Sequence, residues 1–336
     1  MIRRIAIIAL VVAGAIGEAA GCTSALVGAG AALRGYGMLW KHRDSGFHEN
    51  FIQRVNSDGT TLGYTALFNG GDSLLTEAWT GVNDAGFAVM NTASYNLAPD
   101  TAKVRDREGL VMSRALGVCR TVDDFAALLD TLPRPLGVQA NFGVLDASGA
   151  GAYFETDDHG YRRYDLQEDS VLIRTNFSCS GQCGDGLGLE RYAAAEHLIL
   201  PRIGEISPRM LTDTVSSSFY NAELGGDARE LGLKKIRDNG EFIPRRSTSA
   251  SVVIEMTDDG PLLWVILGYP PLSKAQVFRP DAIPEEMLPT LPGGYSRLAR
   301  RNLRLRDRVI TRGRDRQFYV NLRKLPVRTS EGGGKR

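Results

Sequence analysis

Short apolar segments separated by turn residues follow one another along most of the chain after residue 21. Such segments predict strands, because branched and aromatic residues fit a half-buried pleated surface while glycine, asparagine and aspartate favour turns. The predicted strands are 23–27, 38–40, 51–55, 63–68, 73–80, 87–91, 139–145, 152–155, 161–165, 171–175, 247–256 and 262–267. A glycine-rich turn joins the first two, which predicts a hairpin between Cys22 and Asp44.

Helices are predicted over 107–117, 122–130, 189–200 and 207–215, where the patterning changes to apolar residues three or four positions apart. Thr121 is a favourable cap for the second helix, and Asp123 and Asp124 suit its positive end. Two strand-rich blocks, each followed by helices, predict an α+β fold of two antiparallel sheets stacked face to face with helices outside. We find neither an internal repeat nor an interdomain linker, so residues 22–295 are predicted to form one domain.

The composition changes this picture mainly at the C-terminus. Of 336 residues, 43% are hydrophobic and 24% are charged, enough for a full core. Lys and Arg (40) nearly balance Asp and Glu (39), which argues against binding of nucleic acid by bulk charge. Residues 296–336 are a basic extension that we expect to pack on the domain with a solvated face; an anionic surface or a partner is the alternative. From about residue 330 we expect a flexible tail.

The first 21 residues have the parts of a secretory signal peptide: Arg3 and Arg4, an apolar run over 5–16, and small residues at 19–21. The run is well short of the ~20 apolar residues that span a bilayer, and no later segment is long and apolar enough either. We therefore predict removal of the leader and export to the periplasm or the exterior, without stable membrane insertion.

Cleavage after Gly21 would make Cys22 the first residue, with an α-amine beside its thiol. A thiol becomes a strong nucleophile when it is deprotonated, and an α-amine, whose usual pKa is near ~8, can accept that proton close to neutral pH. Cys22 is therefore a candidate nucleophile that carries its own general base.

The same cysteine supports a second hypothesis, because residues 20–22 resemble the end of a bacterial lipoprotein signal. A Cys22 thiol that carries a diacylglycerol cannot be a nucleophile, and the protein would then be an inert, lipid-anchored envelope protein with a binding or structural role. Ala19 stands where such signals prefer leucine, and the strand follows Cys22 without a flexible tether. We favour the nucleophile.

The remaining cysteines are Cys119, Cys179 and Cys183. Export would permit a disulfide between Cys179 and Cys183, and the sequence leaves open whether this pair forms one or stays as two thiols. We expect no metal site, because no second Cys or His pair stands at ligand spacing. We expect no dinucleotide either, since Leu33 takes the place of a third glycine after Gly28 and Gly30. No cofactor is predicted.

Five motifs occur in an order that resembles the N-terminal-nucleophile (Ntn) hydrolases: 22–23 (CT), 39–44 (LWKHRD), 81–86 (GVNDAG), 90–95 (MNTASY) and 174–178 (RTNFS). They are similar to the branch that holds choloylglycine hydrolase, penicillin V acylase and the acyl-coenzyme A:6-aminopenicillanic acid acyltransferases. The similarity runs from Cys22 to about residue 280. It implies a four-layer αββα sandwich and cleavage of linear, non-peptide amides through an acyl-thioester.

The resemblance also implies roles for residues near the start of the domain. Cys22 matches the nucleophile, and Asp44 matches the acid that holds its α-amine. Lys41 stands where bile-salt hydrolases have an arginine close to the thiol, so the charge is kept but the planar fork is lost. His42 replaces an expected asparagine. A cation at Lys41 or Arg43 would stabilise the thiolate.

The donors for a developing oxyanion come from further along the chain. Asn176 matches an asparagine whose side-chain amide helps to form the oxyanion hole, and Asn91, or the backbone just after it, matches the other donor. Arg246 matches an arginine near the site, with Arg245 as the alternative.

These roles describe an amidohydrolase when water resolves the thioester and an N-acyltransferase when an amine does. The substrate is expected to be a small-molecule amide, selected by loops near 45–75 and 178–188. Homo-oligomers are common in the family, and the sequence fixes no number.

Overall fold

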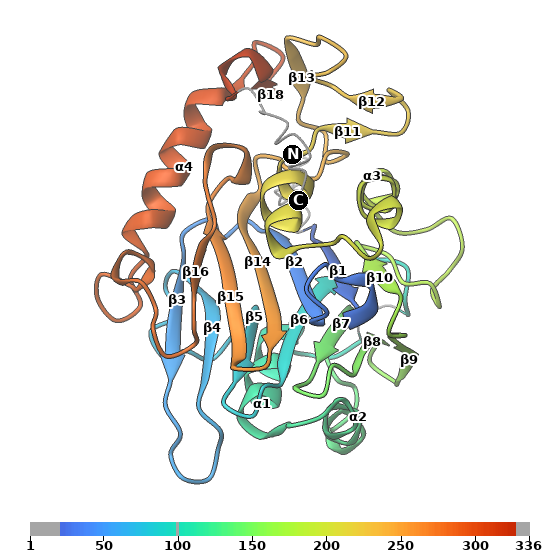
Figure 1. The fold of residues 1–336 in the computed structure, drawn as a ribbon, viewed down its shortest axis with the longest axis vertical. Helices are drawn as coiled ribbons and strands as arrows, with labels where there is room; N and C mark the ends of the chain where they lie inside the picture. Colours follow the sequence, from blue (N-terminus) through green and yellow to red (C-terminus); the bar gives the residue numbers. More distant parts are fainter. Residues whose placement is uncertain (1–20, 99–100, 327–336) are drawn as a thin grey trace, which may run out of the picture.

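Two antiparallel sheets form the centre of the protein in the computed structural model, which describes residues 21–98 and 101–326 (Figure 1). All of the predicted signal except Gly21, and the tail from residue 327, lie outside the described residues. The seven strands of one sheet follow chain order: β3 (Asn50–Val55), β4 (Tyr64–Asn69), β5 (Thr80–Asn83), β6 (Ala88–Ala93), β7 (Ala140–Leu145), β8 (Gly151–Thr156) and β9 (Tyr161–Asp165).

The second sheet gathers strands from distant parts of the chain. Its six strands lie in the order β10 (Val171–Arg174), β1 (Thr23–Val27), β2 (Met38–Asp44), β14 (Thr248–Thr257), β15 (Gly260–Leu267) and β16 (Gln276–Phe278). The predicted hairpin is confirmed, with Thr23 opposite His42 and Val27 opposite Met38. Because β1 is paired with β10 on one side and with β2 on the other, Cys22, the residue that precedes β1, lies at the end of a strand that is fixed on both sides.

Apolar side chains from the facing sides of the two sheets form the central core. The six-stranded sheet contributes Leu26, Leu39 and Val252, and the seven-stranded sheet contributes Ile52 and Met90, all almost fully buried. Alternate residues of each strand point to this layer, so the remaining ones must be covered on the outside.

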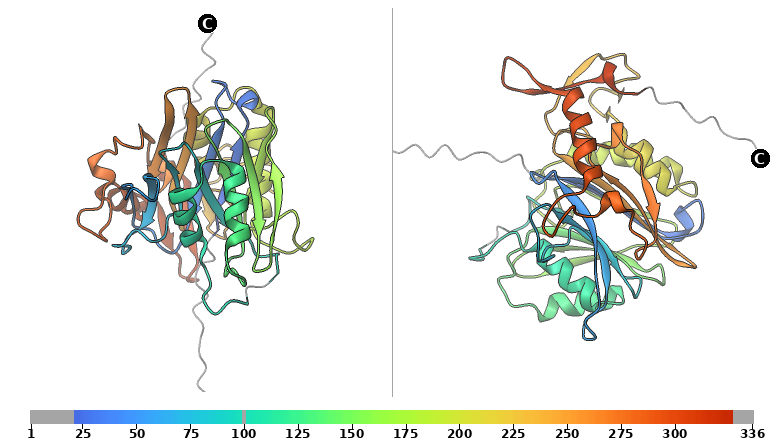
Figure 2. Two further views of the ribbon diagram at one scale, coloured as in Figure 1. Left: turned by 90° about the horizontal axis from the view of Figure 1, so that it is seen from below. Right: turned by 90° about the vertical axis from the view of Figure 1, so that its left-hand side faces the viewer.

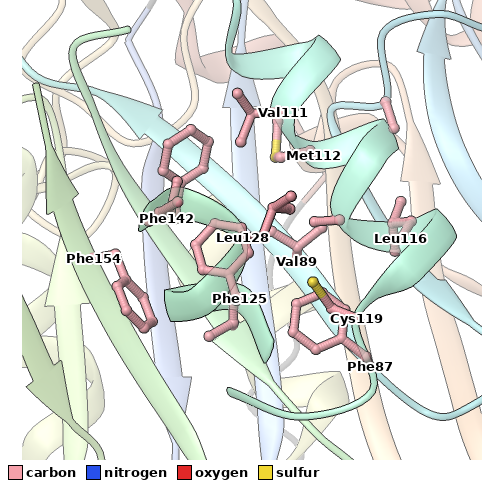
Figure 3. Packing of buried hydrophobic residues seen from close by; sticks show 14 of the residues in the cluster. Phe87, Val89, Val111, Met112, Leu116, Cys119, Phe125, Leu128, Phe142 and Phe154 are labelled. Atoms are coloured by element: carbon pink, nitrogen blue, oxygen red, sulfur yellow. The ribbon is translucent and has the colours of Figure 1, made fainter. Parts of the chain in front are cut away.

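Two helices cover the outer face of the seven-stranded sheet: α1 (Glu108–Val118) and α2 (Val122–Thr131). Figure 3 shows how their apolar side chains meet those of the strands. Phe125 of α2 packs edge-on against Phe154 of β8, with 5.1 Å between the two ring centroids. The cap predicted at Thr121 is present, since its hydroxyl accepts from the Asp124 N–H while the Asp124 carboxylate accepts from the Thr121 N–H.

The outer face of the six-stranded sheet is covered by α3 (Leu189–Ile199) and by a π-helical turn, η3 (Met210–Thr214), where a helix over 207–215 was predicted. Ala194, Ile199 and Leu211 pack there on Ala25 and Trp40. The layers are therefore helix, sheet, sheet, helix, as predicted, and Figure 2 shows them edge-on.

The C-terminal part adds a fourth helix and two small sheets. Helix α4 (Arg297–Val309) buries Leu298 and Ala299 in the core between the two large sheets. The small sheets pair β11 (Tyr220–Asn221) with β12 (Gly226–Asp227), and β13 (Lys235–Arg237) with β18 (Phe318–Asn321) and β17 (Ile310–Arg312). In the described part of the chain, no helix combines the length and the apolar character that crossing a membrane requires.

Two features differ from the sequence-based expectation. The strand predicted over 73–80 is wrong except at Thr80, because the Asp72 carboxylate accepts from the N–H groups of Thr76 and Glu77 and so folds this segment into a turn. The two strand-rich blocks also do not correspond to the two sheets. Ala88 of β6 pairs with Leu145 of β7, so the strands on either side of α1 and α2 share one sheet.

Candidate active site

Cys22 lies where β1 begins, at the wall of a cavity of about 840 Å³. Its side chain is largely buried, since the residue is 8% exposed, and Sγ lies 3.8 Å from the carbonyl oxygen of Asp44. The cavity is bounded by the end of β2, by segments 45–47, 77–79 and 105–108, and by residues 91–97. A thiol in this position faces a space large enough for a small organic substrate.

The pairing of β1 with β2 brings two cations to the cavity. Side chains alternate along β2, so Lys41 and Arg43 share the face that points toward the other sheet, and both line the cavity with Cys22. Lys41 Nζ donates to Asn91 Oδ1 and to the carbonyl oxygen of Trp79, both at 2.6 Å. Because an ammonium only donates, Asn91 turns its oxygen to Lys41 and its amide nitrogen away from it.

Burial perturbs both cations. It lowers the pKa of Lys41 to about 7; the nearby Cys22 thiol opposes this shift and Arg43 adds to it. The pKa of Arg43 falls to about 10 for the same primary reason, burial. Arg43 is held by Asn69 Oδ1 at 2.8 Å and lies 5.0 Å from the ring centroid of Trp79. Lys41 can therefore exchange a proton near neutral pH, whereas Arg43 is a fixed charge.

Asp44 also lines the cavity, and its carboxylate is bonded within a second group of polar side chains. Its Oδ2 accepts from Arg245 Nη2 at 2.7 Å, and its Oδ1 accepts from the hydroxyl of Thr248 at 2.6 Å. The Thr248 hydroxyl gives its proton to Asp44, so Thr248 Oγ1 can only accept from other groups. His42 Nε2 lies 3.2 Å from Thr248 Oγ1 and must therefore carry a proton and donate it. Burial lowers the pKa of His42 to about 4, with Asp44 acting in the opposite direction. His42 is therefore neutral and orients the group.

The arginine in this group is Arg245, so the preference for Arg246 needs correction. The Arg245 guanidinium donates to the Asp44 carboxylate and to the carbonyl oxygen of Gly21, and the Arg245 backbone N–H donates to Thr248 Oγ1 at 3.0 Å. Arg246 points elsewhere, with its guanidinium 4.1 Å from the ring centroid of Phe318. The two neighbours diverge because the chain turns here just before β14 begins.

Asn176 lies behind the cavity wall, beside the backbone of Cys22. Its Nδ2 donates to the carbonyl oxygen of Ala93 at 2.8 Å, and its Oδ1 accepts from Arg191 Nη2 at 2.7 Å. Gly21 is packed against the same side chain: a Cβ there would lie 2.9 Å from Asn176 Oδ1 and 2.1 Å from Arg245 Nη2. A side chain at position 21 would therefore displace the side chains of Arg245 and Asn176.

Arg191 is a site residue that the sequence analysis did not find. It is 1% exposed, and it donates to the carbonyl oxygen of Cys22 at 2.7 Å and to Thr23 Oγ1 at 3.2 Å. Burial lowers its pKa to about 9, and the repulsion of Arg245 adds to the effect. The helix over 189–200 was predicted, but nothing in its sequence distinguishes an inward arginine from a surface one.

The cavity wall also carries several acids. Glu77, Asp106 and Glu108 line it together with Arg105 and Tyr95. Burial raises the pKa of Tyr95 to about 12, and the charges of Cys22 and Glu108 act in the same direction. Burial also raises the pKa of Glu77, with Asp72 and Asp106 as further causes.

The other cysteines lie apart from this group. Cys179 and Cys183 are exposed and unbridged, and burial raises the pKa of Cys119 to about 12. Within residues 21–98 and 101–326, no three histidine, cysteine or acidic side chains are grouped so that they could hold a metal ion.

No protein-family model matches the chain, and no curated protein matches it. Among solved structures, it is similar to a Caenorhabditis elegans ortholog of N-acylethanolamine-hydrolyzing acid amidase, with 16% identity, a TM-score of 0.46, and coverage of 71% of this chain and 95% of the other. A variant of conjugated bile acid hydrolase from Clostridium perfringens is 9% identical, with a TM-score of 0.44 and coverage of 76% of this chain and 92% of the other. Penicillin V acylase from Agrobacterium tumefaciens is 14% identical, with a TM-score of 0.40 and coverage of 76% of this chain and 84% of the other.

Proposed function

We propose that this protein is an amidohydrolase that cleaves linear, non-peptide carbon–nitrogen bonds, with Cys22 as its nucleophile after removal of the leader. One observation carries the proposal: the Cys22 thiol lines a large cavity together with Lys41 and the Asn91 side chain. Thiol, cation and amide donor are the groups that acyl transfer from an amide requires.

Cleavage after Gly21 would leave the new α-amine beside Arg245 and Asn176, the two side chains against which Gly21 packs. Asp44 is bonded to Arg245 there and is available to orient the ammonium form. The α-amine takes the thiol proton, and the thiolate attacks the amide carbonyl to form a carbon–sulfur bond. The ammonium then gives its proton to the leaving amine as the carbon–nitrogen bond breaks.

Water resolves the resulting thioester, which releases a carboxylic acid and restores the thiol. Asn91 is the better placed oxyanion donor, since it lines the cavity and its amide nitrogen is turned away from Lys41. Asn176 already gives one amide hydrogen to Ala93, so its second hydrogen would have to serve the oxyanion. An amine that reached the thioester before water would make the same site an N-acyltransferase.

The burial of Cys22 favours a nucleophile over a lipid attachment point. The thiol belongs to a residue that is only 8% exposed, and it faces the cavity beside Asp44, so a diacylglycerol on it would have to occupy that cavity instead of extending directly into a membrane. Export, which the leader predicts, belongs to this proposal, as does a small-molecule amide substrate.

The test is the intact mass and first residue of the purified protein, before and after a thiol-alkylating reagent, with release of amine measured from a panel of acyl amides. We expect a chain that begins at Cys22 and loses activity on alkylation. Cys22→Ser should lower kcat at least about 1,000-fold, by analogy with other nucleophile deletions, while the matched change Cys183→Ser should leave it unchanged. A diacylglycerol mass on Cys22, or full activity in Cys22→Ser, would refute the proposal.

A further inference from the structure

We propose that the exposed arginines of α4 and of the β17–β18 hairpin form a surface that docks on an anionic lipid bilayer. The charge of the chain is strongly segregated. Residues 297–324 contain eleven basic and two acidic residues, a net charge of +9, whereas the whole chain has +1, so the remainder carries −8. The near balance of the complete sequence therefore hides a concentrated basic region.

Four arginines of α4 form one stripe. Arg297, Arg301, Arg304 and Arg308 are exposed and stand four, three and four positions apart, which places them along one side of the helix. The opposite side carries Leu298, Leu303 and Val309, which are buried. The stripe is about 17 Å long at the usual helical rise, and α4 faces the viewer in the right-hand view of Figure 2.

Little negative charge neutralises the stripe. Arg301 lies 3.5 Å from Glu286, and both side chains are partly exposed to solvent. Arg297, Arg304 and Arg308 make no ion pair with any residue that the structure describes. The two acids of this region are engaged elsewhere, Asp307 with Arg306 and Asp315 with the hydroxyl of Tyr319.

More exposed basic residues follow α4 in the chain, and one of them reaches back to the helix, since Lys324 Nζ donates to the carbonyl oxygen of Arg308 at 3.1 Å. Arg312, Arg314 and Arg316 are exposed in the β17–β18 hairpin, and Arg323 and Lys324 follow β18. Guanidinium groups bind phosphate oxygens in a planar, two-pronged manner, and each basic residue near an anionic bilayer adds measurably to binding.

A bilayer fits this surface better than a nucleic acid. The exposed side of α4 is a straight row of arginines, which a flat array of lipid phosphates can meet along its whole length. The aromatic side chains of the hairpin are also occupied: Phe318 lies under Arg246, and Tyr319 lies under Lys235 and bonds Asp315. They offer no stacking platform for bases.

The test is co-sedimentation of the full mature protein with vesicles of equal parts phosphatidylglycerol and phosphatidylcholine. We expect the protein to bind these vesicles but not vesicles of pure phosphatidylcholine. Binding should also be lost in about 0.5 M salt, because salt at this concentration screens the attraction between exposed arginines and lipid phosphates. The fourfold variant R297Q/R301Q/R304Q/R308Q should reduce the partition constant at least about 100-fold. Glutamine is a good helix former, and thermal melting will verify that α4 is retained.

A second fourfold variant, R114Q/R120Q/R162Q/R202Q, removes the same charge from exposed positions outside the basic region. It should bind the vesicles like the unmodified protein. Equal loss in both variants would show that net charge alone matters, and absence of binding by the unmodified protein would overturn the proposal. So would tighter binding to duplex DNA than to vesicles. If the α4 variant melts early, R304Q/R308Q must still lower binding about tenfold or more.

Discussion

Lys41 is a basic residue that is almost completely buried, and the structure shows which groups hold its ammonium. Its ammonium bonds the Trp79 carbonyl and Asn91 Oδ1 and lies 5.8 Å from the centroid of the Trp79 ring. Two oxygens and an aromatic face are less than water offers, which is why burial lowers the pKa of Lys41 to about 7. Burying this ammonium costs free energy, and the same ammonium fixes the direction of the Asn91 amide.

This cost should appear as pH-dependent stability. Since the pKa of Lys41 is about 7 in the folded protein against 10.5 for an ordinary lysine, the unfolded chain binds more protons between these values. Stability should therefore rise as pH increases from 7 to 9, by up to about 1.4 kcal/mol per pH unit. Urea unfolding at pH 7, 8 and 9 measures it. Lys41→Met should flatten the rise, and Lys274→Met, at an exposed lysine, should not. Equal slopes in all three proteins would contradict the prediction.

At the residue scale, the sequence supported some of this arrangement and not the rest. Cys22, Lys41 and Asn91 could be predicted because a hairpin and an adjacent strand carry them in recognisable motifs. The contact of Asp44 with Arg245 rather than Arg246 depends on the direction of one turn, which side-chain types do not determine. Arg191 could not be predicted, because arginine on a helix is usually at the surface.

At the scale of elements, the site depends on how α3 is attached to β1. Arg191, in the first turn of α3, donates to the backbone of Cys22 and to Asn176. Gly188 precedes the helix with φ of +86°, and a Cβ there would lie 2.2 Å from Arg191 Nη2. A glycine is therefore required where the guanidinium passes back toward the sheet.

Arg191→Gln should separate positioning from the fold. Hydrogen bonds from a charged donor are worth about 1.5–3 kcal/mol each, so we expect a clear fall in the free energy of unfolding. Because Cys22 would lose a backbone anchor, kcat should fall about 100-fold while KM changes less. The readouts are kinetics and urea unfolding, with Arg202→Gln, an exposed arginine just after the same helix, as the control. A variant with unchanged kcat would show that Arg191 only stabilises the protein.

Most elements were predictable because their patterns are local. Strands β1 and β9 have the predicted bounds, and α2 begins at its predicted cap. The short strands β11, β12, β13, β16, β17 and β18 were not predicted, since two to four residues carry too little pattern. The segment over 73–80 was mispredicted because its apolar residues suggested a strand while Asp72 bonded the backbone into a turn.

At the scale of the whole molecule, the stacked sheets were predicted but their membership was not. The order β10, β1, β2, β14 brings together segments up to about 225 residues apart, and no local signal encodes such pairing. This arrangement matters for the site, because Cys22, Asn176 and Arg245 come from three distant segments that meet only when the six-stranded sheet is complete.

Helix α4 is part of the same assembly, which makes the boundary predicted at residue 295 testable. Leu298 and Ala299 belong to the core between the sheets, Leu303 is 7% exposed, and Asn302 Nδ2 donates to the carbonyl oxygen of Leu267 at 2.7 Å. An added module would leave the domain intact when removed. The contacts instead indicate that a chain ending at residue 295 would expose the core and lose a large part of a stability that is typically about 5–15 kcal/mol.

Single substitutions on the two sides of α4 give the sharper measurement. Leu303→Ala removes a buried side chain and should lower the free energy of unfolding by about 2–5 kcal/mol. Arg304→Gln, one residue later on the exposed side, should change it by less than about 0.5 kcal/mol. Both values come from urea unfolding at one pH. Equal, small effects would mean that α4 rests on the surface, and the basic extension would then be an accessory to the stacked sheets rather than a part of their core.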